Sequence, residues 1–344
     1  MQPSTPPIFT VDEGLSGGRR TGTLAGDGWR LRTPAVVPVG PLATAGSLTA
    51  DDLASCGVRA LGVDWVRLWL RPGIETIGTL GGLRRVAGWS GATIAGPAAW
   101  AFANAAARVS DREASVISPV DGSTLRLTPE AAVEAQVALG LDVVAALDWP
   151  DAVARPAKAG EVGRLRLAWA AASLAAGAAS PPAANGAFVL ASVPLASSAE
   201  VIRALGELPF GGYVLEVAAA PRAALGRALS LLPASALRVV DWRGGIAPLA
   251  EIVSAGVDVV RLTGEADRAR EGVVLADGGE MSAVDDAWLD DPGPLEAGCG
   301  CPTCRRFSRA YIRHLYVARE LLGQRLVEAH NLAVLARAAQ IDES

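Results

Sequence analysis

The chain has 344 residues, 51% of them hydrophobic, which is long and apolar enough for one large core or two smaller ones. Its net charge of −5 argues against a free-standing nucleic-acid binder, since such proteins are usually basic. No uninterrupted apolar stretch reaches the roughly 18 residues that span a bilayer, and no signal-like segment opens the chain. We therefore expect a soluble, cytoplasmic protein without membrane contacts.

Residues 1–30 are Gly-rich, and we expect them to form an irregular lead-in. Short apolar, β-branched runs then alternate with helical stretches, a pattern typical of buried parallel strands in an α/β fold. Strands are predicted at residues 35–39, 58–63, 141–147, 187–191, 212–217, 237–240 and 257–262. Helix-start signals lie at residues 47–52, 128–130 and 197–200. Seven or eight β-α units favour a TIM (β/α)8 barrel over residues 31–277.

Three of the four cysteines lie within six residues, in the spacing Cys-x-Cys-x₂-Cys. Such close neighbours would strain any disulfide loop, so a metal explains them better. Zn²⁺ prefers tetrahedral thiolate and imidazole donors, and a histidine follows the last cysteine after 25 intervening residues. The predicted ligands of a structural zinc are Cys299, Cys301, Cys304 and His330. The alternative is that the cysteines are incidental or redox-active and the histidine only caps a surface.

The segment that carries this site is expected to form a separate zinc-binding subdomain with C-terminal helices over residues 278–344. This subdomain begins with an acidic loop at 278–298, which precedes the cysteines. Arg306, Arg309 and Arg313 follow at helical spacing and form one basic stripe, which suits an RNA-backbone contact. A solvated helix face is the alternative reading of that stripe. We expect His314 to be a packed core histidine and Cys56 a small buried apolar residue.

The sequence from Gly298 through Cys-Gly-Cys-Pro-Thr-Cys-Arg-Arg, closed by Glu-Ala-His-Asn-Leu at 328–332, resembles the zinc subdomain of tRNA-guanine transglycosylases. Further blocks match in order: Thr-Pro-Ala-Val-Val-Pro-Val-Gly at 33–40, Leu-Trp-Leu-Arg-Pro-Gly at 68–73, Ser-Pro-Val-Asp-Gly-Ser at 118–123 and Leu-Thr-Pro-Glu at 127–130. The resemblance extends from about residue 18 to residue 335. It implies a TIM barrel with an inserted C-terminal zinc-binding subdomain.

The family resemblance also implies a reaction, the exchange of a guanine in tRNA for a 7-deazaguanine base of the queuosine type. An aspartate attacks the ribose anomeric carbon to give a covalent intermediate, and a second aspartate supplies general acid/base chemistry. A pocket of Asp, Gln and paired Gly backbone amides reads the flipped base. The implied partners are tRNA and a second subunit in a dimer.

Two catalytic positions of the family are altered in this sequence. Gly96 stands where the acid/base aspartate of the Asp-Ser-Gly-Gly-Phe-Gln loop is expected, and Arg261 stands in the nucleophile's place after Gly-Val-Asp. An arginine cannot be deprotonated at working pH, so it cannot attack a sugar carbon. The sequence therefore predicts a barrel that has lost its reaction centre.

The base-reading positions are altered as well, since the family's Gln-Gly-Gly appears as Ser-Val-Pro at 192–194 and its Gly-Gly-Leu as Glu-Val-Ala at 216–218. Asp148 alone keeps its expected place, at the end of a strand, where it is a candidate for base recognition or catalysis. Trp100 could stack on a base, and Arg261 could pair with Glu216 across the barrel mouth. The candidate pocket residues are Asp148, Trp100, Arg261 and Glu216.

These observations leave three hypotheses for the function. The first is a catalytically degenerate, tRNA-binding subunit that forms a homodimer, or a heterodimer with a catalytic paralogue. The second is an active transglycosylase with an altered base or nucleoside substrate, using Asp148 or a relocated carboxylate pair such as Asp64 and Asp241. The third is a zinc-stabilised binding protein outside tRNA modification.

Overall fold

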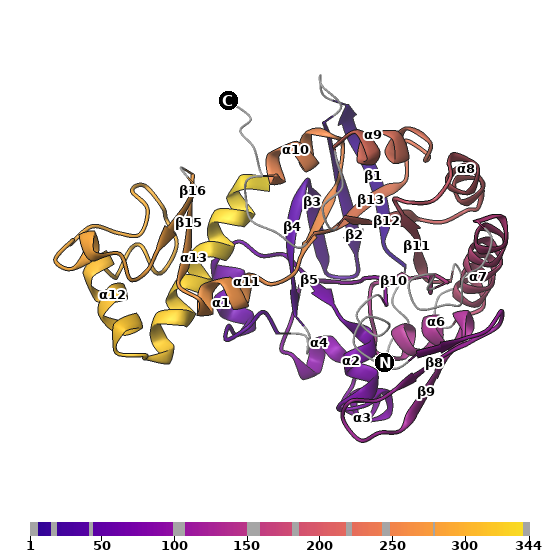
Figure 1. Ribbon diagram of the computed structural model, residues 1–344, viewed down its shortest axis with the longest axis horizontal. Helices are drawn as coiled ribbons and strands as arrows, with labels where there is room; N and C mark the ends of the chain where they lie inside the picture. The colour runs from indigo at the N-terminus through magenta and orange to yellow at the C-terminus, as the bar shows by residue number, and fades with distance from the viewer. Residues whose placement is uncertain are drawn as a thin grey trace.

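The computed structural model describes residues 6–14, 19–40, 44–98, 107–149, 159–180, 186–217, 222–242, 248–277 and 279–339. Within these residues, eight parallel strands close a barrel in the order β10-β11-β12-β13-β14-β4-β5-β6 (Figure 1). The strands are β4 (Ala35–Gly40), β5 (Ala60–Val63), β6 (Ala92–Ala95), β10 (Val143–Ala145), β11 (Phe188–Pro194), β12 (Gly212–Val217), β13 (Leu237–Trp242) and β14 (Val259–Leu262). The predicted TIM-type barrel is confirmed.

All seven predicted strands are present, and the eighth, β6, was not predicted. Its four residues are all buried, but they are too few and too small to give a clear β-branched run. Thr93 fixes the strand in place, because its hydroxyl donates to Asp142 at 2.8 Å and accepts the Asp142 backbone N–H at 3.0 Å. This contact ties β6 to the start of β10, its neighbour in the barrel.

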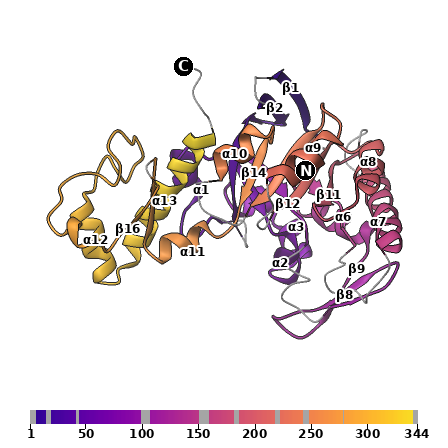
Figure 2. The ribbon, with the colours of Figure 1, turned by 45° about the horizontal axis from the view of Figure 1, so that its top comes forward.

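The three predicted helix starts are also confirmed by side-chain caps. Thr49 caps α1 (Ala50–Ser55) in a capping box, Thr128 caps α6 (Pro129–Ala138), and Ser198 caps α8 (Ala199–Glu207). The other helices around the barrel are α2 (Trp65–Leu70), α3 (Ile74–Thr79), α4 (Leu83–Val86), α7 (Ala159–Ala179), α9 (Arg222–Ser230), α10 (Leu249–Ser254) and α11 (Glu265–Arg270) (Figure 2). No described helix is long and apolar enough to cross a membrane.

The N-terminal lead-in is not irregular, so that prediction was wrong. Strands β1 (Ile8–Gly14), β2 (Arg20–Gly26) and β3 (Trp29–Thr33) form an antiparallel sheet. Its buried side chains, Leu24, Trp29 and Leu31, belong to one hydrophobic cluster with residues of the barrel strands. The sheet therefore packs against the barrel end where the strands begin, and Gly22 and Gly26 occupy strand positions, whereas Gly28 lies in the turn between β2 and β3.

A second antiparallel sheet follows β6 and lies at the opposite end, where the barrel strands finish. It consists of β7 (Ala107–Val109), β8 (Ala114–Ile117) and β9 (Thr124–Leu127). Two tryptophans hold it to the barrel, since Trp149 Nε1 donates to the Ser110 carbonyl and Trp169 Nε1 to the Asp111 carbonyl, at 3.3 and 2.8 Å.

The C-terminal subdomain lies beside the barrel, at the left in Figure 1, and has its own small core that includes Trp288, Leu295 and Ile312. Its elements are β15 (Val273–Ala276), β16 (Gly279–Ser282), the 3-10 turn Asp286–Trp288, α12 (Arg309–Val317) and α13 (Leu321–Ala339). The β15–β16 hairpin spans the predicted boundary at residue 278. The end of α13 packs back into the barrel core, so the subdomain is inserted before the last barrel helix.

Candidate metal centre and barrel mouth

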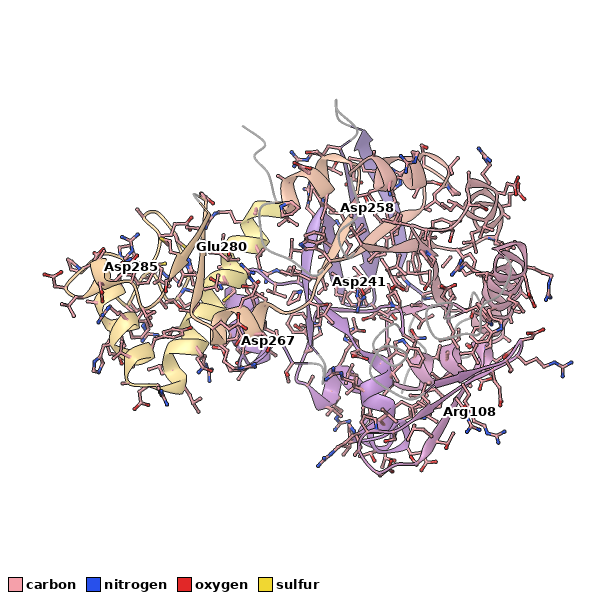
Figure 3. All side chains as sticks on the ribbon, viewed as in Figure 1. Arg108, Asp241, Asp258, Asp267, Glu280 and Asp285 are labelled. Atoms are coloured by element: carbon pink, nitrogen blue, oxygen red, sulfur yellow. The ribbon has the colours of Figure 1, made fainter. Side chains whose placement is uncertain are left out.

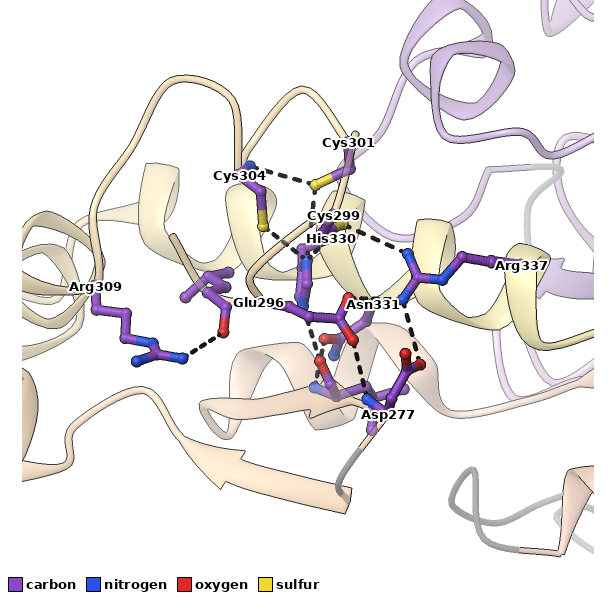
Figure 4. Close-up of polar contacts among 11 residues, drawn as sticks. Asp277, Glu296, Cys299, Cys301, Cys304, Arg309, His330, Asn331 and Arg337 are labelled. Atoms are coloured by element: carbon purple, nitrogen blue, oxygen red, sulfur yellow. Dashed lines mark hydrogen bonds and ion pairs between the residues drawn. The ribbon is translucent and has the colours of Figure 1, made fainter. Parts of the chain in front are cut away.

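The four predicted zinc ligands lie together in the subdomain, with all their donor atoms within 4.8 Å of one another (Figure 4). The Nδ1 atom of His330 is 3.7 Å from Cys299 Sγ, 3.6 Å from Cys301 Sγ and 3.3 Å from Cys304 Sγ. Tetrahedral zinc, with bonds of about 2.3 Å to sulfur and about 2.0 Å to nitrogen, places these atoms about 3.6 Å apart. The residues therefore fit a zinc ion.

The secondary structure around the cluster orients its ligands. The cysteines lie in the loop before α12, and His330 is fully buried in the middle of α13. The Nε2 atom of His330 lies 2.8 Å from the Leu275 carbonyl of β15, so Nε2–H donates there and Nδ1 faces the sulfurs. The neighbouring Asn331 accepts the Leu275 N–H at 2.9 Å and thereby binds the same strand edge to α13.

The cluster holds protons that a metal must displace. A hydrogen bond from Cys304 lowers the pKa of the Cys301 thiol to about 4, against the effect of burial, and the same contact raises the pKa of Cys304. Burial opposes protonation of His330, but hydrogen bonds to Cys299 and Cys301 outweigh it and raise the His330 pKa to about 9. Zinc needs thiolates and a neutral imidazole, so its binding releases protons. Bound there, the ion would join the cysteine loop to α13.

Of the predictions for His314 and Cys56, the first is wrong and the second is confirmed. His314 is exposed on α12, so the prediction of a core histidine was wrong. Cys56 is buried beyond the end of α1, as predicted, and burial raises the pKa of its thiol to about 11. A thiol with so high a pKa is a poor nucleophile and metal ligand.

Gly96 and Arg261, which the family resemblance places at the two catalytic positions, lie against each other in the barrel mouth. Arg261 of β14 has a side chain that is 3% exposed, and it forms an ion pair with Asp241 of β13. Asp241 is labelled near the centre of the molecule in Figure 3. A Cβ atom added at Gly96 would lie 1.6 Å from Arg261 Nη1 and 2.2 Å from its Cζ. The guanidinium therefore occupies the space into which any side chain at position 96 would project.

The strand register explains why Arg261 pairs with Asp241. Asp241 is the direct cross-strand partner of Arg261, whereas Glu216 is the partner of Asp241 on the next strand, one step further round the barrel. Arg261 also donates through Nη2 to the Val63 carbonyl at 3.4 Å. Arg261 is thus paired with a carboxylate that the sequence did not suggest as its partner, and its pairing with Glu216 stays a prediction.

Asp148, which keeps its family position, is paired with an arginine. Arg166 of α7 donates through Nε to Asp148 at 2.8 Å and through Nη1 to Ser197 at 3.1 Å, and its side chain is only 4% exposed. No motif of the sequence indicated this pairing. Trp100, the predicted stacking residue, lies outside the described residues.

The proposed relocated carboxylates, Asp64 and Asp241, are each held by an arginine of their own. Asp64 caps α2 through the Arg67 backbone N–H at 3.4 Å and pairs with Arg67 Nε at 3.1 Å. Burial raises the pKa of Asp64, partly countered by Arg67 and by Arg261. Asp241 carries the ion pair with Arg261.

A cavity of about 590 Å³ opens beside this mouth, lined by residues that follow β4 and β14 and by α11 and α13. Charged groups of both signs line it, among them Asp64, Arg67, Glu265, Arg270 and Glu328. Glu328 accepts hydrogen bonds from the backbone N–H and hydroxyl of Ser47, at 3.0 and 2.8 Å. The cavity thus lies between the barrel and the helix that carries His330.

The predicted basic stripe does not lie on one helix. Ser308 caps α12, so Arg306 precedes the helix. Arg309 bonds Asp291 at 3.0 Å and the Leu295 carbonyl at 3.1 Å, and Arg313 bonds Asp286 at 2.6 Å. The acidic loop, to which the sequence assigned no role, therefore pairs with Arg309 and Arg313 through Asp291 and Asp286.

Comparison with known proteins shows the family of this chain. The family model described as queuine tRNA-ribosyltransferase matches residues 15–340. A queuine tRNA-ribosyltransferase of Desulfosudis oleivorans is 31% identical over 334 residues, covering 91% of this chain and 85% of that protein. Those of Thiobacillus denitrificans and Sorangium cellulosum are 32% and 33% identical, covering 92% and 97% of this chain and 88% and 87% of the relatives. The chain therefore belongs to the queuine tRNA-ribosyltransferase family.

Proposed function

We propose that this chain is a catalytically silent member of its family, which binds tRNA and serves as a partner subunit in 7-deazaguanine modification. The observation that carries the proposal is the Arg261 guanidinium packed onto Gly96 and paired with Asp241. The family resemblance assigns a nucleophile and an acid/base group to positions 261 and 96. In this chain one of those positions is a cation, and the other has no side chain.

The residues at positions 96 and 261 cannot supply the acid/base group and the nucleophile of the family reaction. A carboxylate at position 96 would collide with the guanidinium, and Arg261 cannot act as a nucleophile at neutral pH. At Asp148, the ion pair with Arg166 competes with any hydrogen-bond donor of a purine. The three candidate catalytic carboxylates, Asp64, Asp148 and Asp241, are thus each paired with an arginine.

The parts outside the mouth are retained, which supports a role in binding. The metal ligand set is complete, and Arg305 and Arg306 stay exposed beside the cysteine loop, where they can contact phosphates. Apolar side chains are exposed where α12 turns into α13, with Val317 59%, Leu321 77% and Leu322 41% exposed. Such a group of apolar residues supports a protein partner at this turn.

The test is exchange of radiolabelled guanine into tRNA by the purified protein, alone and with a paralogue that carries the intact Asp-Ser-Gly-Gly loop. We expect no exchange by this chain alone, co-purification with the paralogue, and a measurable change in the paralogue's exchange rate. Exchange by this chain alone would contradict the proposal. If that exchange were lost in Asp148→Asn or Asp241→Asn, it would identify an active enzyme with a rearranged site.

A further inference from the structure

Arg337, an arginine that no motif of the sequence singled out, contacts the metal cluster. Its Nη1 atom lies 3.7 Å from Cys299 Sγ, and its Nη2 atom lies 2.6 Å from Glu296 Oε2 and 3.3 Å from Asp277 Oδ1. Figure 4 shows the guanidinium between the sulfur on one side and the two carboxylates on the other. Arg337 follows His330 by seven residues on α13, so both side chains leave the same face of the helix.

The guanidinium is held in a fixed orientation. Glu296, 11% exposed at its side chain, accepts Arg337 through Oε2 and the Asp277 backbone N–H through Oε1, at 3.0 Å. Glu296 lies three residues before Cys299, so the same carboxylate also anchors the loop that carries the first ligand. Planar arginine is suited to this arrangement, because its fork of N–H groups reaches a carboxylate and a sulfur together.

The chemistry of the ligand set makes such a cation useful. Three thiolates and one Zn²⁺ leave a net charge of −1 on the centre, and the sulfurs remain nucleophilic toward oxidants and alkylating agents. A hydrogen bond to a metal-bound sulfur draws electron density from it and orients it. Cys301 already accepts the Cys304 backbone N–H at 3.3 Å, whereas Arg337 is the donor at Cys299.

We propose that Arg337 is a positioning residue of the metal centre, which holds Cys299 as a ligand and protects its sulfur from electrophiles. The inference concerns retention of the metal and is independent of whether the barrel mouth catalyses base exchange. It predicts a site-specific weakness when Arg337 is removed: Cys299 becomes the first ligand to react, and zinc leaves with it.

The experiment compares Arg337→Met with Arg337→Lys and the control Arg325→Met in the zinc-loaded protein. Arg325 lies on the same helix and pairs with Asp52. Zinc transfer to a chromogenic chelator and iodoacetamide labelling, resolved by cysteine with mass spectrometry, give the two rates. We expect Arg337→Met to raise both rates about tenfold, with Cys299 labelled first and the other two cysteines labelled only as zinc leaves. Arg337→Lys should recover part of the protection, and Arg325→Met should behave as wild type.

Cobalt substitution supplies a readout that a merely structural role would not change. Loss of a donor to a bound thiolate shifts the sulfur-to-cobalt charge-transfer band to lower energy, so Arg337→Met should show this red shift at unchanged melting temperature. Unchanged rates and an unshifted band would overturn the proposal. Equal labelling gains at all three cysteines with a lowered melting temperature would overturn it too, because they would show a general loosening of the fold.

Discussion

Arg261 and Gly96 are complementary in shape: the buried guanidinium of one occupies the space that any side chain of the other would need, with Nη1 at 1.6 Å from an added Cβ. The family resemblance places the two catalytic aspartates at these same positions. A side chain at position 96 would require the Arg261 guanidinium to move from this position. The residues at positions 96 and 261 are therefore coupled by their packing in this structure.

The coupling predicts that Gly96→Ala destabilises the protein. The new methyl group forces Arg261 away from Asp241, and separating a largely buried ion pair costs about 2 kcal/mol in unfolding free energy, measured by urea denaturation. Gly226→Ala on α9 is the matched control, because nothing lies within 4 Å of its added Cβ. That control should be neutral or slightly stabilising.

A double-mutant cycle with Arg261→Ala tests the same coupling. Once the guanidinium is gone, Gly96→Ala has room, so its cost in the Arg261→Ala background should fall well below its cost in the wild type. Strictly additive free energies would contradict the packing described at the barrel mouth.

A second prediction concerns Asp148. Replacing it with Asn leaves the Arg166 guanidinium, 4% exposed, without its counter-charge, and the unfolding free energy should fall by about 2 to 3 kcal/mol. Asp111→Asn is the control, since its pair with Arg164 is long, at 4.0 Å, and both side chains are more than half exposed. That change should stay within about 0.5 kcal/mol. Equal effects of the two substitutions would show that the Asp148 pair is not a structural element.

The sequence predicted the elements whose signals are local, and missed those that depend on packing between distant segments. Apolar runs and caps at Thr49, Thr128 and Ser198 located strands and helices correctly. The N-terminal sheet was missed because a Gly-rich sequence is typical of loops. The packing of Leu24 and Trp29 against the barrel strands, which stabilises the sheet, leaves no local signal. Cys-x-Cys spacing identified the metal site, whereas the partners of arginines come from remote elements and leave no spacing signal.

The titration of the metal ligands predicts a pH-dependent affinity for zinc. Without metal, His330 has a pKa raised to about 9 by its hydrogen bonds to the cysteines, against the effect of its burial, so it is protonated at neutral pH. Zinc must displace that proton, so the apparent affinity should rise by about tenfold per pH unit for each proton released as pH increases from 6 toward 9. Competition with a chelator of known proton affinity measures the slope. A flat profile would contradict the assignment of His330 as a ligand.

The last prediction is that the metal is structural. Freshly purified protein should contain close to one zinc per chain, and Cys301→Ser should lower that ratio and unfold the region after residue 272, because the cluster joins the cysteine loop to α13. The expected signs are rapid proteolysis after residue 272, loss of the helical signal of α12 and α13, and a lowered melting temperature of the barrel, because the end of α13 packs into its core. Cys56→Ser is the matched control, since Cys56 is buried but belongs to no ligand group among the described residues. A zinc ratio well below one in the wild type would reject the Cys₃His assignment. A folded C-terminal region in Cys301→Ser would show instead that the hydrophobic cluster of the subdomain, which includes Trp288 and Ile312, suffices without the ion.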